Sequence, residues 1–220
     1  MDDTFRLMCE NKELFTVNFM KSNYNDEEYW RHCAPFPDDF VERYSEHINF
    51  GYLLKIQKMS IWSNQLILKR IIDNDLVRLL LLEQKVPMDG IIYLVNNGDD
   101  NWDILSCNQV LSEEFMDMYR DRLDWIYITE RQTFGIEFML RNREYIRWDL
   151  LHMNKNYEDL ITDEVLPLII SKFRWVEMDR LKLSEKTLMD NLDEISETTL
   201  MNLANYGMIK SKDEDEIYRL

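Results

Sequence analysis

The sequence is poor in glycine and proline, with 5 Gly and 4 Pro among 220 residues. Tight turns between strands and glycine-rich phosphate loops depend on these two residues, so their shortage disfavours both features and favours helices. Cysteine is equally scarce. Cys9, Cys33 and Cys107 are far apart and outside any C-x-x-C spacing. They therefore form neither a disulfide framework nor a cysteine-based zinc motif, and we expect a reducing compartment.

Long apolar segments are also missing. The longest aliphatic run, residues 79–82, is far shorter than the roughly 20 residues that a transmembrane helix needs. Residues 1–4 show neither the basic nor the apolar region of a signal peptide. We therefore expect an intracellular protein with no signal peptide, no transmembrane segment and no membrane partner.

Positive charge is scarce relative to negative charge. The chain has 26 Lys and Arg against 42 Asp and Glu, which gives a net charge of -16 at pH 7. Such a charge repels phosphate backbones, so we expect no direct contact with nucleic acid. With 45% hydrophobic and 12% aromatic residues, the chain nevertheless has enough apolar material to form a core.

A repeat organises the chain. Trp102, Trp125 and Trp148 are separated by 23 and 23 residues. Apolar residues recur three positions after these anchors and ten and fourteen positions before them: Leu105, Ile128, Leu151; Ile92, Phe115, Phe138; Met88, Leu111, Phe134. Weaker anchors extend the register to a mean period of about 24 residues: Trp30, Phe50, Leu76 and Trp175.

Each repeat contains signals for two short helices. In residues 111–120, Ser112 can cap a helix whose first turn holds Glu113 and Glu114, where acids favour the helix dipole. A second start signal directly precedes several anchors, because a residue that can cap a helix stands there: Asn49, Asp75, Asn101 and Asp124.

Helices of roughly ten residues are marginal when isolated, so the repeats must stack on one another. We therefore predict an all-α fold, an elongated α-solenoid of about seven to eight helix-turn-helix repeats. The expected organisation is an N-terminal cap segment (1–13), a repeat array (14–209, with a degraded last repeat at 183–209) and a charged tail (210–220). The tryptophan anchors should be buried between repeats: Trp102, Trp125, Trp148 and Trp175.

The motif of one repeat resembles a known class of short repeat. Leu111-Ser112-Glu113-Glu114-Phe115, followed by Asp124-Trp125-Ile126-Tyr127-Ile128, is similar to the all-α repeats found in proteins of large DNA viruses and some phages. The resemblance implies a viral protein, located in the host cytoplasm or the virion. It implies no chemistry.

Candidate catalytic and metal-binding residues do not converge in the sequence. His32, His47 and His152 are isolated, and no H-E-x-x-H or Cys/His ligand spacing is present. Cys33 and Cys107 stand near anchors, where small buried hydrophobic residues are expected. We therefore expect a protein that is not an enzyme and has no cofactor and no metal.

One segment departs from the acidic character of the chain. Between residues 120 and 147 every basic residue is an arginine, and acids are interspersed among them. Such a segment is typical of a solvated helix surface with ion pairs, but arginine is also enriched at interface hot spots. The candidate protein-contact residues are Arg120, Arg122, Arg131, Arg141, Arg143 and Arg147.

These features favour a non-catalytic protein-interaction or structural module, because helical arrays present extended surfaces that bind proteins. The resemblance extends this to a virion or assembly component, or to a factor that binds a host protein. The alternative is an acidic mimic of nucleic acid that inhibits a DNA- or RNA-binding protein. The partner's identity, the face used and the oligomeric state stay open.

Overall fold

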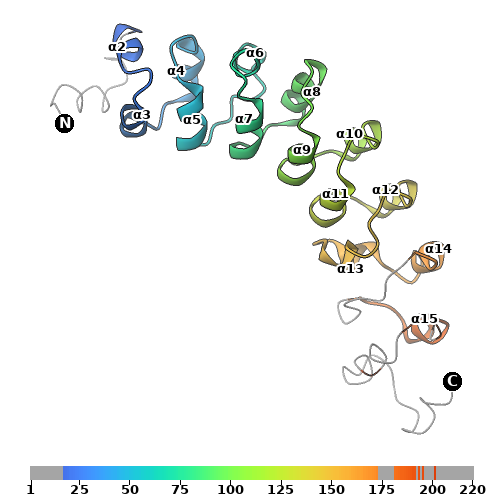
Figure 1. The fold of residues 1–220 in the computed structure, drawn as a ribbon. Coiled ribbons are helices and arrows are strands. Elements are labelled where there is room, and N and C mark those ends of the chain that lie inside the picture. Colours follow the sequence, from blue (N-terminus) through green and yellow to red (C-terminus); the bar gives the residue numbers. More distant parts are fainter. Residues whose placement is uncertain (1–16, 173–180, 192, 194, 196–200, 202–220) are drawn as a thin grey trace. The chain divides into compact units, whose positions relative to one another are not determined.

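The computed structural model describes residues 17–172, 181–191, 193, 195 and 201. Every regular element among these residues is a helix, and none is a strand (Figure 1). The predicted all-α fold class is therefore confirmed. The predicted cap segment (1–13), the anchor Trp175, Cys9 and the charged tail (210–220) lie outside the described residues.

The chain divides into two compact units, Met1–Ser112 and Glu113–Leu220. The sequence pattern did not indicate this division. The described helices of the first unit are α2 (Val17–Ser22), α3 (Glu27–Cys33), α4 (Asp38–Arg43), α5 (Phe50–Ile56), α6 (Gln65–Asp73), α7 (Val77–Glu83), α8 (Met88–Asn96) and α9 (Trp102–Asn108). Those of the second unit are α10 (Glu113–Met118), α11 (Trp125–Arg131), α12 (Ile136–Arg141), the 3-10 helix η2 (Leu151–Met153), α13 (Tyr157–Leu160), α14 (Leu166–Ile169) and α15 (Glu185–Met189).

Within the first unit, the helices form two rows (Figure 1). The second helices of successive repeats pack on one another, α3 on α5, α5 on α7 and α7 on α9. The first helices α6 and α8 pack in the other row. This packing of short helices against their neighbours is the repeat-like arrangement expected from the sequence, while a solenoid over the whole chain stays a prediction.

The predicted helix starts are confirmed at two anchors. Asn49 accepts a hydrogen bond from the Tyr52 amide at the start of α5, and Asp124 accepts one from the Ile126 amide at the start of α11. Each cap satisfies a backbone N–H that has no partner within its helix.

At Asp75 the predicted cap is wrong. Asp75 lies in the left-handed region, with φ 56°, and the Leu76 amide donates back to the Ile71 carbonyl of α6. This is the pattern that closes the C-terminus of a helix, and aspartate tolerates the left-handed conformation. Asp75 therefore belongs to the turn that closes α6, and α7 begins only at Val77.

The tryptophan anchors differ in burial. Trp102 and Trp125 are buried, as predicted, and Trp125 stacks on Phe138 with 6.1 Å between ring centroids. Trp148 is half-buried and so less buried than the other two. The reason is local: η2 begins at Leu151, which leaves Trp148 in the preceding turn rather than in a helix.

Two expected core positions are exposed. Leu66 is 75% and Ile92 is 43% exposed, while the adjacent Ile67 and Ile91 are buried in their place. Each exposure reflects a shift of one residue relative to the anchor. α7 starts at Val77, one residue after the assumed anchor. The buried Ile91 lies eleven residues before Trp102, whereas Phe115 lies ten residues before Trp125.

A ladder of side-chain amides connects the second helices from α5 to η2, and the sequence pattern did not indicate it. The residue directly after each of these five helices is an amide: Gln57, Gln84, Gln109, Gln132 and Asn154. Of these five, all but Gln57 are buried.

In the first unit, Gln84 and Gln109 make the same set of hydrogen bonds. The Gln84 amide donates to the carbonyls of Leu54 and Gln57 at 2.6 and 2.9 Å, and its oxygen accepts from the Met59 amide. Gln109 repeats these three bonds one helix later, to Leu81, Gln84 and Val86.

The carbonyls that the ladder engages stand at a helix C-terminus, where backbone acceptors have no partner within the helix. In the second unit, Asn154 likewise donates to the Thr129 and Gln132 carbonyls at 2.6 and 3.0 Å. Gln84, Gln109 and Asn154 therefore satisfy the end of the preceding second helix and fix its distance from the next. Gln57 instead bonds to the Phe36 backbone in the α3–α4 loop.

Candidate interaction surfaces

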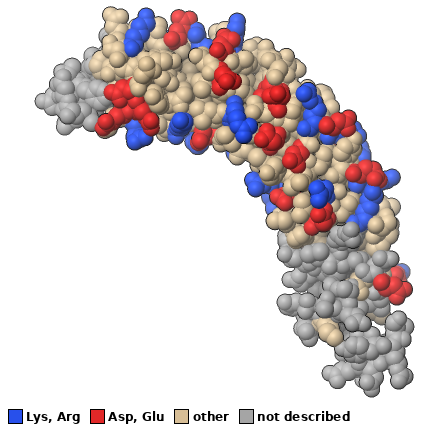
Figure 2. Space-filling view, in the orientation of Figure 1, with Lys and Arg blue, Asp and Glu red and all other residues tan. Residues whose placement is uncertain are grey.

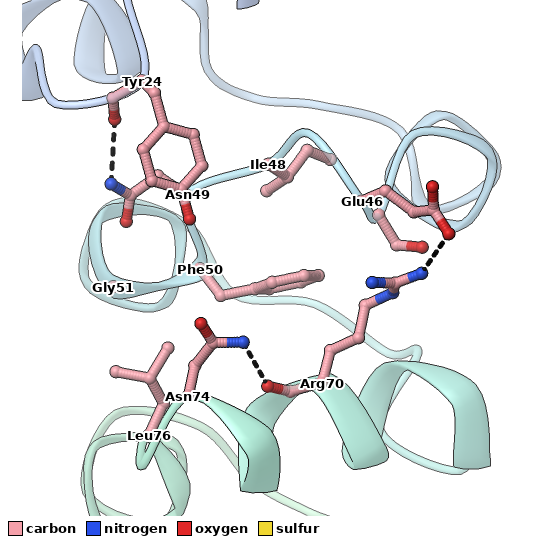
Figure 3. Close-up of a pocket in the computed structure, with 10 residues that line it drawn as sticks. Tyr24, Glu46, Ile48, Asn49, Phe50, Gly51, Arg70, Asn74 and Leu76 are labelled. Atoms are coloured by element: carbon pink, nitrogen blue, oxygen red, sulfur yellow. Dashed lines mark hydrogen bonds and ion pairs between the residues drawn. The ribbon is translucent and has the colours of Figure 1, made fainter. Parts of the chain in front are cut away.

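A polar hollow of about 280 Å³ lies in the first unit, between the α4–α5 loop and the turn that joins α6 to α7 (Figure 3). The Phe50 ring extends toward its centre and the Tyr24 ring borders it. Ten residues line the hollow: Tyr24, Ser45, Glu46, Ile48, Asn49, Phe50, Gly51, Arg70, Asn74 and Leu76.

The polar groups around this hollow bind one another. Arg70 pairs with Glu46 at 2.7 Å, which joins α6 to the α4–α5 loop. Asn74 donates to the Arg70 carbonyl, and the Asn49 amide donates to the Tyr24 carbonyl (Figure 3). The Arg70–Glu46 and Asn49–Tyr24 contacts hold neighbouring repeats together, and none of the three contacts places a nucleophile beside a base.

A second hollow, of about 490 Å³, lies at the same position of a repeat in the second unit. It is bordered by Ile146 and Trp148, the counterparts of Ile48 and Phe50. Lys172 pairs with Glu144 at 2.6 Å, as Arg70 pairs with Glu46. The hydrogen bond from Lys172 holds the pKa of Glu144 below its ordinary value. Such hollows therefore arise where consecutive repeats meet.

Arg141 and Arg120 of the predicted contact segment both pair with Asp117. The guanidinium of Arg141 is 2.9 Å from the Asp117 carboxylate, and that of Arg120 is 3.9 Å away. Partial burial would raise the pKa of Asp117. The hydrogen bonds from Asn142 and Arg141, together with the two guanidinium charges, outweigh this effect and hold the pKa below its ordinary value. Arg141 thus links α12 to α10.

The other arginines of the segment have local contacts. Arg143 lies 3.6 Å from Glu144, and Arg147 lies 3.2 Å from Asp149. Arg131 lies over the Tyr127 ring, 5.3 Å from its centroid, and Arg122 is exposed. The structure therefore does not gather the six arginines into one cationic cluster. Their role in protein contact stays a prediction.

The histidines and cysteines are dispersed. His32 is exposed, with Nδ1 at 2.7 Å from the Glu28 carbonyl oxygen, and His152 is half-buried. Cys33 is buried as expected, whereas Cys107 is half-buried. Among the described residues, no group of three or more His, Cys, Asp or Glu side chains could hold a metal ion. None of the described helices has the length and apolar character needed to span a membrane.

Charge is distributed unequally between the two rows of the first unit. Within residues 35–110, the segments of the first helices (35–49, 61–75 and 87–101) contain nine acids and three bases: Asp38, Asp39, Glu42, Glu46, Asp73, Asp75, Asp89, Asp99, Asp100; Arg43, Lys69, Arg70. The segments of the second helices (50–60, 76–86 and 102–110) contain two acids and four bases: Glu83, Asp103; Lys55, Lys58, Arg78, Lys85. On the face drawn in Figure 2, acidic and basic side chains are interspersed.

The second helices of the first unit also present apolar side chains to solvent. Leu82 of α7 is 48% exposed, and Leu79, one turn earlier, is half-buried. Tyr52 and Cys107 are half-buried at the positions of α5 and α9 that correspond to Leu79 and Leu82 when the repeats are aligned on their ladder amides. We call these four residues the α7 strip. The sequence pattern did not indicate this strip, because the apolar residues that recur in each repeat predict only the buried positions.

Comparisons of the chain with models of protein families, with curated proteins and with solved structures give no match.

Proposed function

We propose that the chain is a non-catalytic module that binds a protein partner or forms part of a protein assembly. The observation that carries this proposal is the division of labour within a repeat. The ladder amides Gln84 and Gln109 connect consecutive repeats by the same contacts, while the exposed side chains differ from one repeat to the next. A repeat array of this kind supplies a constant scaffold and a variable surface, which suits binding of a protein.

The virus-related part of the proposal rests on the resemblance of the motif around Phe115 and Trp125 alone. Under it, the partner is either a component of a virion or a host protein.

Affinity capture with mass spectrometry tests the proposal, using the full chain as bait in extracts of the cells in which it occurs. A variant with Arg131→Glu and Arg143→Glu tests the predicted arginine contacts, because these side chains only contact a ring or a sequence neighbour. Arg31→Glu in α3 is the matched control, since Arg31 is exposed and also pairs locally, with Glu27. We expect the control to retain the partner and the double variant to capture at least about tenfold less.

Two results would contradict this proposal. If no protein is enriched over an unrelated acidic bait, the interaction module is wrong. Turnover of a nucleotide, peptide or nucleic-acid substrate by the purified chain would contradict the non-catalytic assignment. If the double variant still captures the partner, only the predicted arginine contacts are wrong, and the interaction module stands.

The acidic first-helix row of the first unit favours the second candidate, a mimic of nucleic acid. A mimic must present closely spaced negative charge, and the bases interspersed on the face in Figure 2 argue against this candidate. Competition decides between the candidates. A mimic displaces DNA or RNA from its captured partner in a strongly salt-dependent manner, whereas a general interaction module leaves the bound nucleic acid in place.

A further inference from the structure

We infer that the α7 strip, formed by Tyr52, Leu79, Leu82 and Cys107, is a docking surface for a protein segment that carries aliphatic side chains flanked by carboxylates. The inference deepens the proposed function, on which it rests, because it names a surface and the chemistry of its partner.

The strip is continuous over three neighbouring helices. α5 packs on α7 and α7 packs on α9, so equivalent positions on these helices are neighbours on the surface. Leu79 and Leu82 are one turn apart on α7 and share one face of the helix. Leu82 is 48% exposed, although Leu80 and Leu81 beside it are fully buried. Contiguous apolar surface of this kind is typical of protein interaction sites.

The charges around the strip select the partner's sign. Four bases and two acids stand on the segments that carry it. Both acids are already paired: Glu83 with Lys58 at 3.9 Å and Asp103 with Arg78 at 3.7 Å.

Two cations therefore remain for a partner. Lys55, at the α5 position equivalent to Leu82, has no carboxylate partner in the described part of the chain. Lys85, directly after α7, donates to the Asn108 carbonyl and not to a carboxylate. A chain of net charge -16 thus carries a locally positive rim around an apolar strip. Carboxylates on the partner would complement this rim.

The strip is specific to the first unit. In the second unit the positions equivalent to Leu82, two residues before the ladder amide, are Glu130 and His152. A charged glutamate at this position disfavours burial of an aliphatic partner side chain.

Selection of peptides from a random phage-displayed library, with the full chain as the immobilised target, tests the inference without a known partner. We expect enriched peptides to combine aliphatic residues with Asp or Glu. Leu82→Lys should weaken their binding at least about tenfold, because it replaces the most exposed apolar side chain of the strip by a charged one. The matched control is Leu66→Lys, at an even more exposed leucine on the first-helix row. It should leave binding unchanged, and circular dichroism should show that both variants stay helical.

Enrichment of basic peptides, or of peptides that bind the Leu82→Lys variant as tightly as the unmodified chain, would overturn the inference. So would the absence of any enriched peptide. The two proposals fail separately. If the Leu82→Lys variant captures a protein from extracts as well as the unmodified chain does, the interaction module stands. The strip is then excluded as the docking surface.

Discussion

The repeats that contain α9 and α11 differ by one residue from the repeat that contains η2. The ladder amide is the seventh residue after the anchor in the first two, Gln109 after Trp102 and Gln132 after Trp125. In the third, Asn154 is the sixth residue after Trp148, and there a 3-10 helix replaces the α-helix.

The geometry of the two helix types explains this difference. A 3-10 helix rises about 2.0 Å per residue against about 1.5 Å in an α-helix, so fewer residues span a similar distance. The amide that closes the shorter segment is asparagine, one methylene shorter than glutamine, and it still reaches two carbonyls of the preceding helix. The length of the ladder side chain and the type of helix therefore change together.

The largest expected effect sharpens the contrast between the two kinds of anchor. Trp125 is buried, stacks on Phe138 and donates to the Arg120 carbonyl at 2.8 Å. Trp125→Ala should therefore lower the free energy of unfolding by about 4 kcal/mol, as expected for a buried aromatic residue. Trp148→Ala should cost about half as much, because Trp148 is half-buried. Urea denaturation followed by circular dichroism measures both. Equal losses would show that the helix type does not affect the anchor.

The sequence predicts much of this fold but not the ladder. The apolar period and the caps indicate helix pairs, and they place α5 and α11 correctly, because both signals are local along the chain. Gln84 and Gln109 carry no such signal. A glutamine is most often a surface residue, and only stacking of the repeats brings it to carbonyls 25 to 30 residues earlier.

The candidate site was harder to predict for the same reason. The sequence shows an arginine-rich segment, but the partner of Arg141 is an aspartate 24 residues away, at a distance set by packing. The expectation that Leu66 and Ile92 lie in the core is wrong, because one-residue differences in spacing from the anchors shift the buried positions to Ile67 and Ile91. Exposure at Leu82 likewise follows from how α5, α7 and α9 are aligned.

The second prediction breaks the match between amide length and spacing. Gln109→Asn places the shorter side chain in a seven-residue segment, where it cannot reach Leu81 and Gln84 while accepting from the Val86 amide. Buried groups left without partners should lower the free energy of unfolding by about 3 kcal/mol. The control Gln65→Asn makes the same change at an exposed position of α6 and should cost at most about 0.5 kcal/mol. Chemical denaturation compares them, and equal stability of the two variants would show that amide length is unimportant.

The third prediction concerns the close approach of α8 to the preceding repeat in the first unit. A Cβ atom on Gly90 would lie 2.2 Å from the Trp62 carbonyl oxygen and 2.8 Å from Val86 Cγ1. Gly90→Ala therefore forces α8 away from the backbone and should cost about 2 kcal/mol. Gly135→Ala in the second unit is the control, because its Cβ would meet only the Glu113 carboxylate, at 3.5 Å. Thermal melting of both variants checks this, and a Gly90→Ala variant as stable as the control would contradict the close contact.

The smallest expected effect concerns the ion pair that joins repeats at Asp117. Its contribution to stability depends on pH, whereas the contribution of the ladder amides does not. Asp117 binds Asn142 and Arg141 through its carboxylate, which lowers its pKa from the usual 3.8. Since the folded protein binds this proton more weakly than the unfolded chain does, the stabilisation is present above about pH 4 and is lost as the pH falls through the lowered pKa. Asp117→Asn should therefore cost about 1 kcal/mol at pH 7. Its difference from the unmodified chain should shrink toward pH 3.

Urea titrations at several pH values measure this difference, with Asp100→Asn as the control for loss of one exposed charge. The control should show a smaller difference at neutral pH and a weaker dependence on pH. A cost for Asp117→Asn that stays constant down to pH 3 would mean that Asp117 contributes through its shape and not through its charge. Ladder variants such as Gln109→Asn should show that constant cost, because an amide does not titrate in this range.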